Sequence, residues 1–379
     1  MRGIDRRAFL RMLAGAAPAG LGLLLGPRAL RAAGPAEMIE RNEWPEHWET
    51  TLDALGRSWL TRNDRFFVRS HLPVPDVDPA SYRLEITGLV GAPLSLTLDE
   101  LKELPRIEMP CTFECAGNGR GLLSPPNTAG TQWARGAVGN ARWGGAPLAT
   151  LLRRAGVLPE GRHVWFEAAD RAPHPDVPAF LRSIPIEKAM QDALLAYDMN
   201  GEALPKLHGA PLRAIVPGWY GMASTKWVTR VRVENQPSDN HFMARGYRYN
   251  RPGEDPTLAA PIEEMRIKSV VTWPRDGAKL PLAKFRAQGF AWAGSPGVKR
   301  VDVSSDGGTS WRPAGFMGET VPHAWRSWTT EIDVKSPRRL TLMARATDGN
   351  GRQQPVEASV NAGGYANNSI HRITIHVRG

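Results

Sequence analysis

The sequence predicts two folded domains, an α+β domain followed by an all-β sandwich of the immunoglobulin type. The chain has 379 residues, which exceeds the roughly 100–200 residues of a typical single domain. Helix-like and strand-like segments alternate up to about residue 255, whereas short strand-like runs separated by turn residues fill the chain from about residue 260. Apolar residues make up 42% and charged residues 23%, a composition typical of globular proteins. The predicted domains are 34–255 and 256–379.

Residues 1–33 have the features of an export signal. Arg6 and Arg7 stand side by side, and an uncharged apolar stretch follows over residues 12–26. That stretch is shorter than the roughly 20 residues that a membrane-spanning helix needs. The paired arginines indicate a twin-arginine signal, which exports proteins already folded. We therefore expect a periplasmic protein without a membrane span once the signal is removed; an ordinary signal or an uncleaved anchor helix is the alternative.

The positive charge of the chain is concentrated in this signal. Residues 1–33 hold six Arg and one Asp, and so carry half of the formal net charge of +10. After residue 33 no run of five or six like charges occurs. A nucleic-acid-binding protein usually has a basic stripe or an arginine-rich run. The charge pattern therefore argues against nucleic acid as a partner and fits a small anionic one.

The α+β domain is predicted from its helix signals and its alternating segments. Residues 96–104 begin with a Thr-x-x-Glu capping box and place leucines three residues apart, which predicts a helix. Residues 147–156 begin with Pro and end with Gly, which favours a second helix. The segments 213–217 and 227–234 are strand-like.

The sandwich is predicted from recurring strand-like runs. Asp-Gly and Gly-Gly steps lie between several of them, a pattern typical of hairpins. The predicted strands cover residues 268–274, 298–303, 325–334, 340–346 and 371–377. About 120 residues of this texture indicate an immunoglobulin-like sandwich.

The sharpest chemical motif is CTFECAGNGR, residues 111–120. The glycines after Cys115 permit a tight turn that exposes the sulfur, and Arg120 favours its thiolate form. From these residues alone, a buried inert cysteine is at least as good an interpretation. Two Cys with three residues between them, no further Cys and no following His make a poor zinc site, and no CxxCH motif for covalent haem occurs. We interpret Cys111 as a small core residue.

Several blocks of the sequence resemble the sulfite oxidase family of molybdenum enzymes. They are FFVRSHLPVP (66–75), ECAGNGR (114–120), GAVGNARWGG (136–145), HGAPLRAIVPGWYG (208–221), STKW (224–227) and GYRY (246–249). They occur in the order of the family and precede a β-sandwich of the right size. The resemblance implies a sulfite-oxidase-type molybdopterin-binding domain followed by an immunoglobulin-like dimerisation domain.

The resemblance also implies a set of site residues. Cys115 matches the cysteine that supplies molybdenum with its protein thiolate, a ligand suited to a soft metal. Arg69, Arg120 and Arg372 match the arginines around an anionic substrate, where guanidinium groups present paired donors. Tyr247 matches the tyrosine beside the transferred oxygen. The alternative for each is a surface charge or, for Tyr247, a packed aromatic residue.

Further residues match positions that hold the molybdopterin. These are His71, Asp170, His208, Arg213, Ser224, Thr225 and Lys226. Arg and Lys at such positions neutralise the phosphate of the cofactor, and the hydroxyls donate hydrogen bonds to it. For a single His such as His71, a structural role is the alternative.

The implied activity is two-electron oxygen-atom transfer that converts sulfite to sulfate. The cofactor is molybdenum–molybdopterin, and the electrons leave one at a time. Animal members carry a haem domain ahead of the molybdenum domain; we expect no such domain here and therefore a separate c-type cytochrome as acceptor. Gly119 also stands where animal members have a further arginine. We expect a homodimer, or a heteromer with a cytochrome subunit.

Three other functions stay open at the level of the sequence. The sulfane dehydrogenase of the thiosulfate-oxidising complex has the same architecture. The methionine-sulfoxide reductase branch is disfavoured because it lacks the sandwich. A scaffold protein of the same fold without cofactor is disfavoured by the intact set of Cys115, Arg69 and Tyr247.

Overall fold

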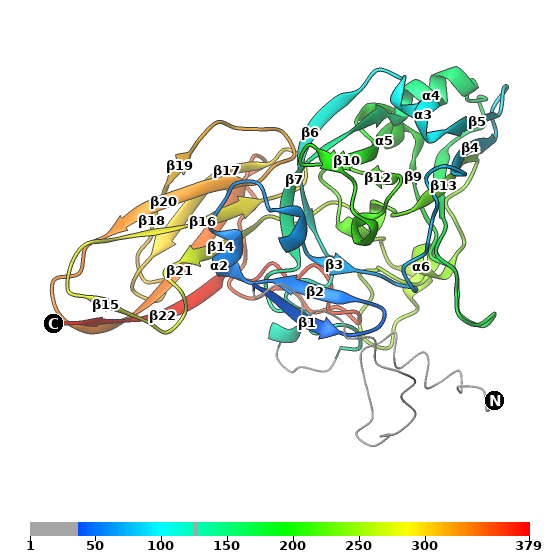
Figure 1. Cartoon of the computed structure of the whole chain (residues 1–379). Helices are drawn as coiled ribbons and strands as arrows, with labels where there is room; N and C mark the ends of the chain where they lie inside the picture. Colours follow the sequence, from blue (N-terminus) through cyan, green and yellow to red (C-terminus); the bar gives the residue numbers. More distant parts are fainter. Residues whose placement is uncertain (1–36, 124–127) are drawn as a thin grey trace, which may run out of the picture.

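The computed structural model describes residues 37–123 and 128–379. The predicted signal, 1–33, lies outside the described residues. Figure 1 shows the C-terminal strands as one elongated lobe and the strands and short helices of the first 240 or so residues as another. The predicted domain boundary at residue 255 falls in the connection between these lobes, next to the short 3-10 helix η5 (Pro256–Leu258).

The described residues of the first domain form three sheets. The smallest consists of β1 (Met38–Asn42), β2 (His47–Thr50) and β3 (Val68–Arg69). The second consists of β6 (Ile107–Glu114), β7 (Val138–Pro147), β10 (Leu194–Met199), β11 (Glu202–Ala203) and β12 (Arg213–Ile215). The third consists of β4 (Arg83–Gly88), β5 (Leu94–Thr97), β8 (His163–Ala168), β9 (Arg182–Pro185) and β13 (Val228–Glu234). The pair β4–β13 is parallel, and the other described pairs of these sheets are antiparallel.

The helices of this domain are short. They are α2 (Leu52–Leu55), α3 (Leu98–Lys102), α4 (Leu148–Ala155), α5 (Ile186–Gln191) and α6 (His241–Ala244). The predicted capping box is present at α3, where Thr97 and Glu100 each accept a hydrogen bond from the other's backbone N–H. The predicted second helix, α4, ends at Gly156, whose φ of 67° is the left-handed conformation that favours glycine at a helix C-terminus. Both helix predictions are confirmed.

The main core of this domain packs α3, α4 and α5 against the sheets. Its fully buried side chains include Leu101 of α3, Leu151 and Leu152 of α4, and Phe166 of β8. Burying such side chains stabilises the folded chain by about 1.5–3 kcal/mol each. This core leaves the loops at the ends of β3, β6 and β12 to form the site described below.

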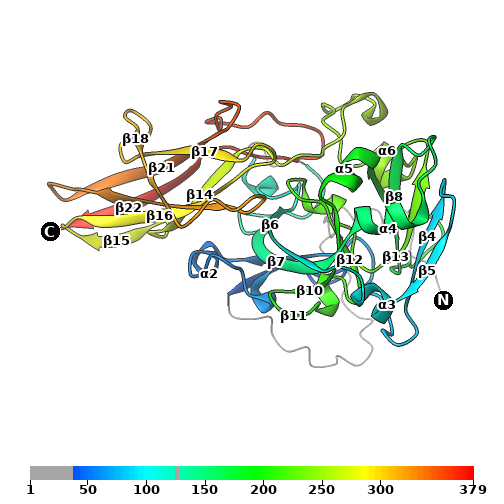
Figure 2. The same ribbon diagram turned by 90° about the horizontal axis from the view of Figure 1, so that it is seen from above.

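The C-terminal domain is a sandwich of two sheets (Figure 2). One sheet has the order β14 (Lys268–Trp273), β16 (Phe285–Trp292), β20 (Arg326–Ile332) and β19 (Gly315–Met317). The other has the order β15 (Ala278–Pro281), β22 (His371–Arg378), β21 (Arg338–Asp348), β17 (Val298–Ser304) and β18 (Arg312–Pro313). The predicted strands correspond to β14, β17, β20, β21 and β22, and the predicted sandwich is confirmed.

An apolar cluster joins the two domains. It brings Ala116 and Tyr247 of the first domain together with Val270, Phe290 and Trp292 of the sandwich. The sandwich therefore packs directly against the loop that carries Cys115. No helix among the described residues has the length and apolar character needed to cross a bilayer.

Candidate functional site

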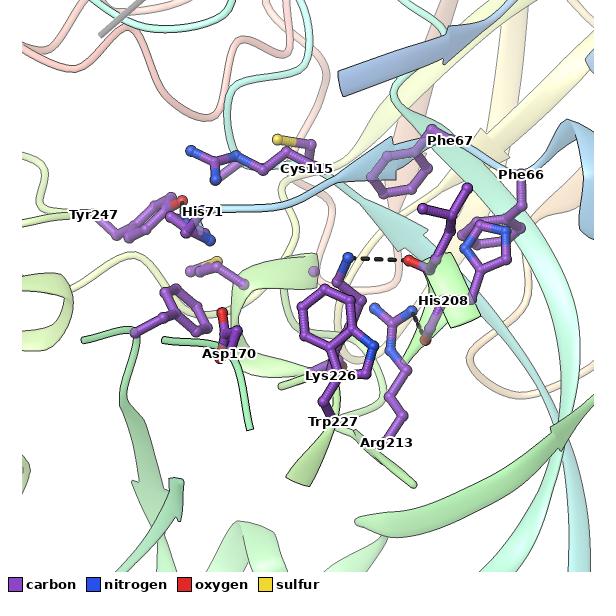
Figure 3. A pocket seen from close by; sticks show the side chains of 17 residues that line it. Phe66, Phe67, His71, Cys115, Asp170, His208, Arg213, Lys226, Trp227 and Tyr247 are labelled. Atoms are coloured by element: carbon purple, nitrogen blue, oxygen red, sulfur yellow. Dashed lines mark hydrogen bonds between the residues drawn. The ribbon is translucent and has the colours of Figure 1, made fainter. Parts of the chain in front are cut away.

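A cavity lies in the first domain, between β3, the loop after β6 and the segments that flank β12 (Figure 3). We call it the inner cavity. Most of the predicted site residues line it: Arg69, His71, Cys115, Asp170, His208, Arg213, Ser224, Lys226 and Tyr247. The sequence blocks that carry these residues are far apart along the chain, and the fold brings them to one place.

One end of the inner cavity is strongly cationic. Arg213 donates from Nη1 to the carbonyl of His208 at 3.1 Å and stacks on the rings of Phe113 and Trp143. Lys226 donates to Ser70 Oγ at 2.9 Å and to the carbonyl of Leu207 at 3.0 Å. Figure 3 shows both side chains beside His208. No described acidic side chain forms an ion pair with either cation.

Burial disfavours the charged forms of Arg213 and Lys226, and the repulsion between them disfavours that of Lys226 further. Burial lowers the pKa of Arg213 to about 9. Burial, together with the charge of Arg213, lowers the pKa of Lys226 well below its usual value. A buried cation without a counterion is destabilising, and an anion placed between the two would remove that cost. This end of the cavity is therefore built for an anionic group.

Polar atoms without partners in the described structure point to the same conclusion. Arg213 Nε, Arg69 Nη1 and Asp170 Oδ1 belong to residues that line the inner cavity, and they are buried and make no hydrogen bond. Burial raises the pKa of Asp170 to about 6. Buried polar groups are almost always hydrogen-bonded in native proteins. A ligand that carries both donors and acceptors would satisfy them, and a phosphate-bearing pterin has that chemistry.

The hydroxyls and the histidine of this end are held in place by the backbone. Ser224 Oγ accepts a hydrogen bond from the N–H of Val216 at 3.0 Å, which leaves its O–H free to donate. Thr225 is buried but is not among the residues that line the inner cavity. His208 Nε2 donates to the carbonyl of Asn63 at 2.9 Å, and burial lowers its pKa to about 3. His208 is thus a neutral residue of the wall.

Cys115 lies at the other end, directly after β6. Its backbone N–H donates to the carbonyl of Ala137 at 2.9 Å, and its carbonyl accepts from the N–H of Asn118 at 2.8 Å. Gly119 has a φ of 90°, which glycine adopts without strain. A Cβ on Gly117 would come within 2.9 Å of Arg120 Nη1. The glycines of the motif therefore allow both the turn and the close packing of Arg120.

Burial raises the pKa of the Cys115 thiol, and the nearby charge of Arg69 opposes this effect. Cys111, by contrast, is fully buried in an apolar cluster, where burial raises its pKa to about 12. Both cysteines are free. Cys115 lines the inner cavity and a pocket next to it, whereas Cys111 is 0% exposed, so Cys115 is the cysteine that a metal can reach.

Tyr247 and His71 form a pair beside Cys115. The His71 Nε2 and Tyr247 O–H groups are 2.5 Å apart, and the His71 ring stacks on Phe180. Tyr247 has a φ of 56°, a left-handed conformation that is rare for a residue other than glycine. Burial raises the pKa of Tyr247 and lowers that of His71. Tyr247 therefore keeps its proton and is a hydrogen-bond donor.

A second, outer pocket adjoins the inner cavity. Both pockets share Arg69, His71, Cys115 and Tyr247 in their walls, and the outer pocket adds Arg120. Arg120 is held by hydrogen bonds from Nε to the carbonyl of Gly363 at 2.8 Å and from Nη1 to that of Thr131 at 3.1 Å. Two arginines thus flank the sulfur on the side away from the cationic end.

The structure does not bring Arg372 to this site, and the prediction for this residue is wrong. Arg372 lies on β22 of the sandwich, opposite Met343 of β21. Its neighbours His371 and Ile373 point into the protein, so the alternation of a β-strand turns Arg372 outward, where it is exposed. It lines neither the inner cavity nor the outer pocket.

Other residues of the site did not emerge from the sequence. Aromatic rings of Phe66, Phe67 and Trp227 line the inner cavity. They belong to the blocks FFVRSH and STKW, so their position next to the predicted residues could have identified them as part of the site. Tyr365, whose ring lies 4.9 Å from the Arg120 guanidinium, comes from the sandwich and has no such signal. Arg182 is fully buried with its guanidinium 5.5 Å from the Tyr247 ring.

Comparison with protein families agrees with this architecture. Residues 71–242 match the oxidoreductase molybdopterin-binding domain, and residues 259–378 match the Mo-co oxidoreductase dimerisation domain. The first match contains most of the residues that line the inner cavity, and the second covers the sandwich. The cofactor that this type of domain binds is molybdopterin with its molybdenum.

Individual relatives are similar in sequence to this chain over most of its length. Mitochondrial sulfite oxidase of Mus musculus is 38% identical over 353 residues, which cover 88% of this chain and 64% of that protein. This chain thus spans just under two thirds of the mouse protein. Sulfite oxidase of Gallus gallus is 39% identical over 82% of this chain and 71% of its own length. The crystal structure of the sulfane dehydrogenase SoxCD from Paracoccus pantotrophus superposes with a TM-score of 0.80 at 30% identity, covering 94% of this chain and 93% of that one.

Each of these relatives is similar to the chain over both domains, and the residues of the inner cavity fit the cofactor of the matched domain. The chain therefore belongs to the sulfite oxidase family of molybdenum enzymes.

Proposed function

We propose that the protein oxidises sulfite to sulfate and passes the two electrons, one at a time, to a c-type cytochrome. The observation that carries this proposal is the grouping of Arg69, Arg120 and Tyr247 around Cys115 in the outer pocket. Overall, sulfite and water give sulfate, two protons and two electrons. The names of the sulfite oxidases that resemble the chain support the same substrate.

The cofactor supplies the oxygen-atom transfer and the two-electron change of the metal. In the chain, Cys115 offers the thiolate ligand. Arg213 and Lys226 bind the phosphate end, and Ser224 donates a hydrogen bond there. Asp170, with its unpartnered Oδ1, accepts from the donors of the pterin.

The outer pocket binds and orients the substrate. Arg69 and Arg120 attract the oxyanion and hold it by charge-assisted hydrogen bonds, since a guanidinium group presents paired donors that match an oxyanion. Tyr247 directs its O–H toward the reacting oxygen, and His71 fixes the phenol in place. Because these groups are already held by the protein before substrate arrives, little reorganisation accompanies the reaction.

The cellular setting is part of the proposal. The twin-arginine motif in residues 1–33 supports export to the periplasm with the cofactor already inserted. The match to a dimerisation domain supports a homodimer. The similarity to SoxCD supports a heteromer as the other assembly, and we propose a cytochrome subunit as the partner in it.

A second candidate function is that of a sulfane dehydrogenase subunit. The specific observation in its favour is the superposition on SoxCD, which extends over nearly the whole of both chains. In that case the substrate would be a sulfane sulfur rather than free sulfite.

The experiment that separates these functions is an assay of the purified, molybdenum-loaded protein under argon with oxidised c-type cytochrome. We expect sulfite to reduce the cytochrome with formation of an equal amount of sulfate. No reduction with sulfite, combined with reduction in the presence of a persulfide substrate, would falsify the sulfite proposal and support the second function. About one molybdenum per chain, measured by elemental analysis, separates either enzyme from a scaffold without cofactor.

A further inference from the structure

A buried network joins the sandwich to the loop that carries Cys115. At its centre is Glu114, the last residue of β6, which is only 1% exposed. Glu114 Oε1 accepts from Lys268 Nζ at 2.6 Å and from Asn118 Nδ2 at 2.9 Å. Glu114 Oε2 accepts from Trp292 Nε1 at 2.8 Å. Lys268 and Trp292 belong to β14 and β16 of the sandwich, which Figure 1 shows beside β6.

The same network holds the loop after Cys115 at a second point. Lys268 Nζ also donates to the carbonyl of Asn118 at 3.2 Å. Asn118 in turn accepts at Oδ1 from the N–H of Ala137, whose carbonyl accepts from the N–H of Cys115. The two residues on either side of the Cys115–Gly117 turn are therefore both fixed to one lysine of the other domain.

A further segment of the sandwich holds the rest of the loop. The N–H of Ala366 donates to the carbonyl of Ala116 at 2.7 Å, and Asn367 Nδ2 donates to that of Gly119 at 2.7 Å. The backbone carbonyls of Ala116, Asn118 and Gly119, which all follow Cys115, thus take hydrogen bonds from the C-terminal domain. The loop is anchored on more than one side by that domain.

A role in stability alone would not explain this buried ion pair, because burying the two charges costs free energy. A buried ion pair loses the hydration of both charges, and well-packed apolar residues often stabilise a fold as well or better. What such a pair provides is a single geometry. We propose that Glu114, Lys268 and Trp292 are positioning residues through which the C-terminal domain sets the place of the Cys115 sulfur at the molybdenum. This inference rests on the proposed role of Cys115 as metal ligand.

The test compares two identical substitutions in the sandwich. Trp292→Phe removes the donor to Glu114 Oε2 and keeps an aromatic ring in place. Trp328→Phe is the control, because Trp328 is also fully buried and its Nε1 donates at 3.1 Å to Ser269 Oγ rather than to Glu114. Both variants lose one buried hydrogen bond, so a general loss of stability affects both alike.

Two readouts report on the position of the sulfur. In the cofactor-free full-length protein, the rate of alkylation of Cys115 by iodoacetamide is followed by mass spectrometry. In the molybdenum-loaded protein, the g-values of the Mo(V) electron paramagnetic resonance signal report on the metal's ligands. We expect Trp292→Phe to raise the alkylation rate and to lower sulfite turnover by about tenfold each, as misplacement of a reacting group by a fraction of an ångström does. Its g-values shift, while Trp328→Phe leaves all three measurements near those of the wild type.

Equal alkylation rates in Trp292→Phe and wild type would overturn the proposal, as would the same change in both variants. Unchanged g-values in Trp292→Phe would overturn the link to the metal. Cys115→Ser then tells whether the ligand assignment fails as well, since the g-values of that variant change only if the sulfur is bound to molybdenum. A Glu114→Gln, Lys268→Met double variant, which removes both charges together, is expected to reproduce the Trp292→Phe result without leaving a buried unpaired charge.

Discussion

The inner cavity and the sandwich differ in whether their buried polar atoms have hydrogen-bond partners. In the sandwich, Asp348 Oδ1 accepts from the N–H groups of Asn350 and Arg352 at 2.9 Å each, and its Oδ2 accepts from Arg352 Nε at 2.6 Å. In the cavity, Arg213, Asp170 and Arg69 each keep a buried atom without a partner in the described structure. A few sandwich atoms, such as Thr347 Oγ1, also lack a partner, but they do not line this cavity.

This difference indicates that the residues of the cavity lower the stability of the cofactor-free protein so that the site can bind its ligand. An unpartnered buried polar group costs about 1–3 kcal/mol. A ligand that binds only the folded protein stabilises it by an amount that grows with the logarithm of the ligand concentration divided by its dissociation constant. The buried Asp348 of the sandwich has its partners within the protein, whereas the unpartnered atoms of the cavity can gain partners from a bound cofactor.

The largest effect is expected at the thiol. Cys115→Ser should lower sulfite turnover by about a thousandfold or more, because a serine hydroxyl is a hard, weakly acidic ligand for a metal that prefers thiolate. The protein should stay folded, since Cys115 lies in the cavity wall rather than in an apolar core. Turnover of the loaded protein and its circular dichroism spectrum check both statements.

Cys111→Ser is the matched control for this substitution. Cys111 lies in the fully apolar cluster of Phe113 and Trp143, so the buried hydroxyl should lower the free energy of unfolding by about 1–3 kcal/mol. Turnover per molybdenum should stay near that of the wild type. Normal turnover in Cys115→Ser, or its loss in Cys111→Ser alone, would contradict the assignment of the ligand.

The cationic end of the cavity gives the next effect. Arg213→Met should lower the molybdenum content per chain by about tenfold, because the phosphate loses a charge-assisted contact. The cofactor-free protein should be as stable as the wild type, or more stable by about 1 kcal/mol, since a buried charge without a counterion is removed. Elemental analysis and urea unfolding of the cofactor-free protein measure the two quantities. A large loss of stability in the cofactor-free variant would show that Arg213 is chiefly structural.

The fold was largely predictable because its signals are local. A capping box determines where α3 begins, and alternation together with turn residues indicates strands such as β17 and β21. The strand β16 was not predicted, because its sequence FRAQGFAW mixes Gly and polar residues with aromatics and carries no clear alternation. Its burial comes from packing between sheets, which depends on residues distant along the chain.

The residues of the candidate site also differ in whether a local sequence pattern identifies them. Cys115, Lys226 and Tyr247 stand in distinctive blocks of sequence, and the structure brings them together around one cavity. Arg372 stands in an ordinary strand without such a block, and its position on β22 is set by the alternation of that strand. The hydrogen bond from Lys268 to Glu114 joins residues 154 positions apart, and no local pattern reveals such a pair.

Acid should destabilise the cofactor-free protein through the histidines of the first domain. Burial lowers the pKa of His47 and of His208 to about 3. In the unfolded chain a His titrates near 6.5. Their contribution to stability is therefore complete above about pH 6.5 and is lost as the pH falls from there toward 3, by about 1.4 kcal/mol per pH unit for each fully buried His. Asp170, with its pKa raised to about 6, opposes this loss only between about pH 6 and 4.

Urea unfolding of the cofactor-free protein at several values between pH 7 and pH 5 measures this slope. His208→Gln keeps an N–H donor for the carbonyl of Asn63, and it should reduce the slope by the equivalent of about one proton. An unchanged slope in His208→Gln would show that His208 does not titrate as its burial requires.

The smallest effect is expected at Arg372, where the structure departs from the sequence-based assignment. Its side chain is exposed on β22 and makes no ion pair among the described residues. Arg372→Ala should therefore leave KM for sulfite within about twofold of the wild type and change the free energy of unfolding by less than about 0.5 kcal/mol. Arg69→Gln, at a cationic wall shared by both pockets, should instead raise KM by about tenfold or more, because the anion loses a charge-assisted contact. Steady-state kinetics of the two variants side by side checks the comparison. A similar rise of KM in Arg372→Ala would mean that the arginine reaches a substrate site in the assembled protein, for example that of a second copy of the chain.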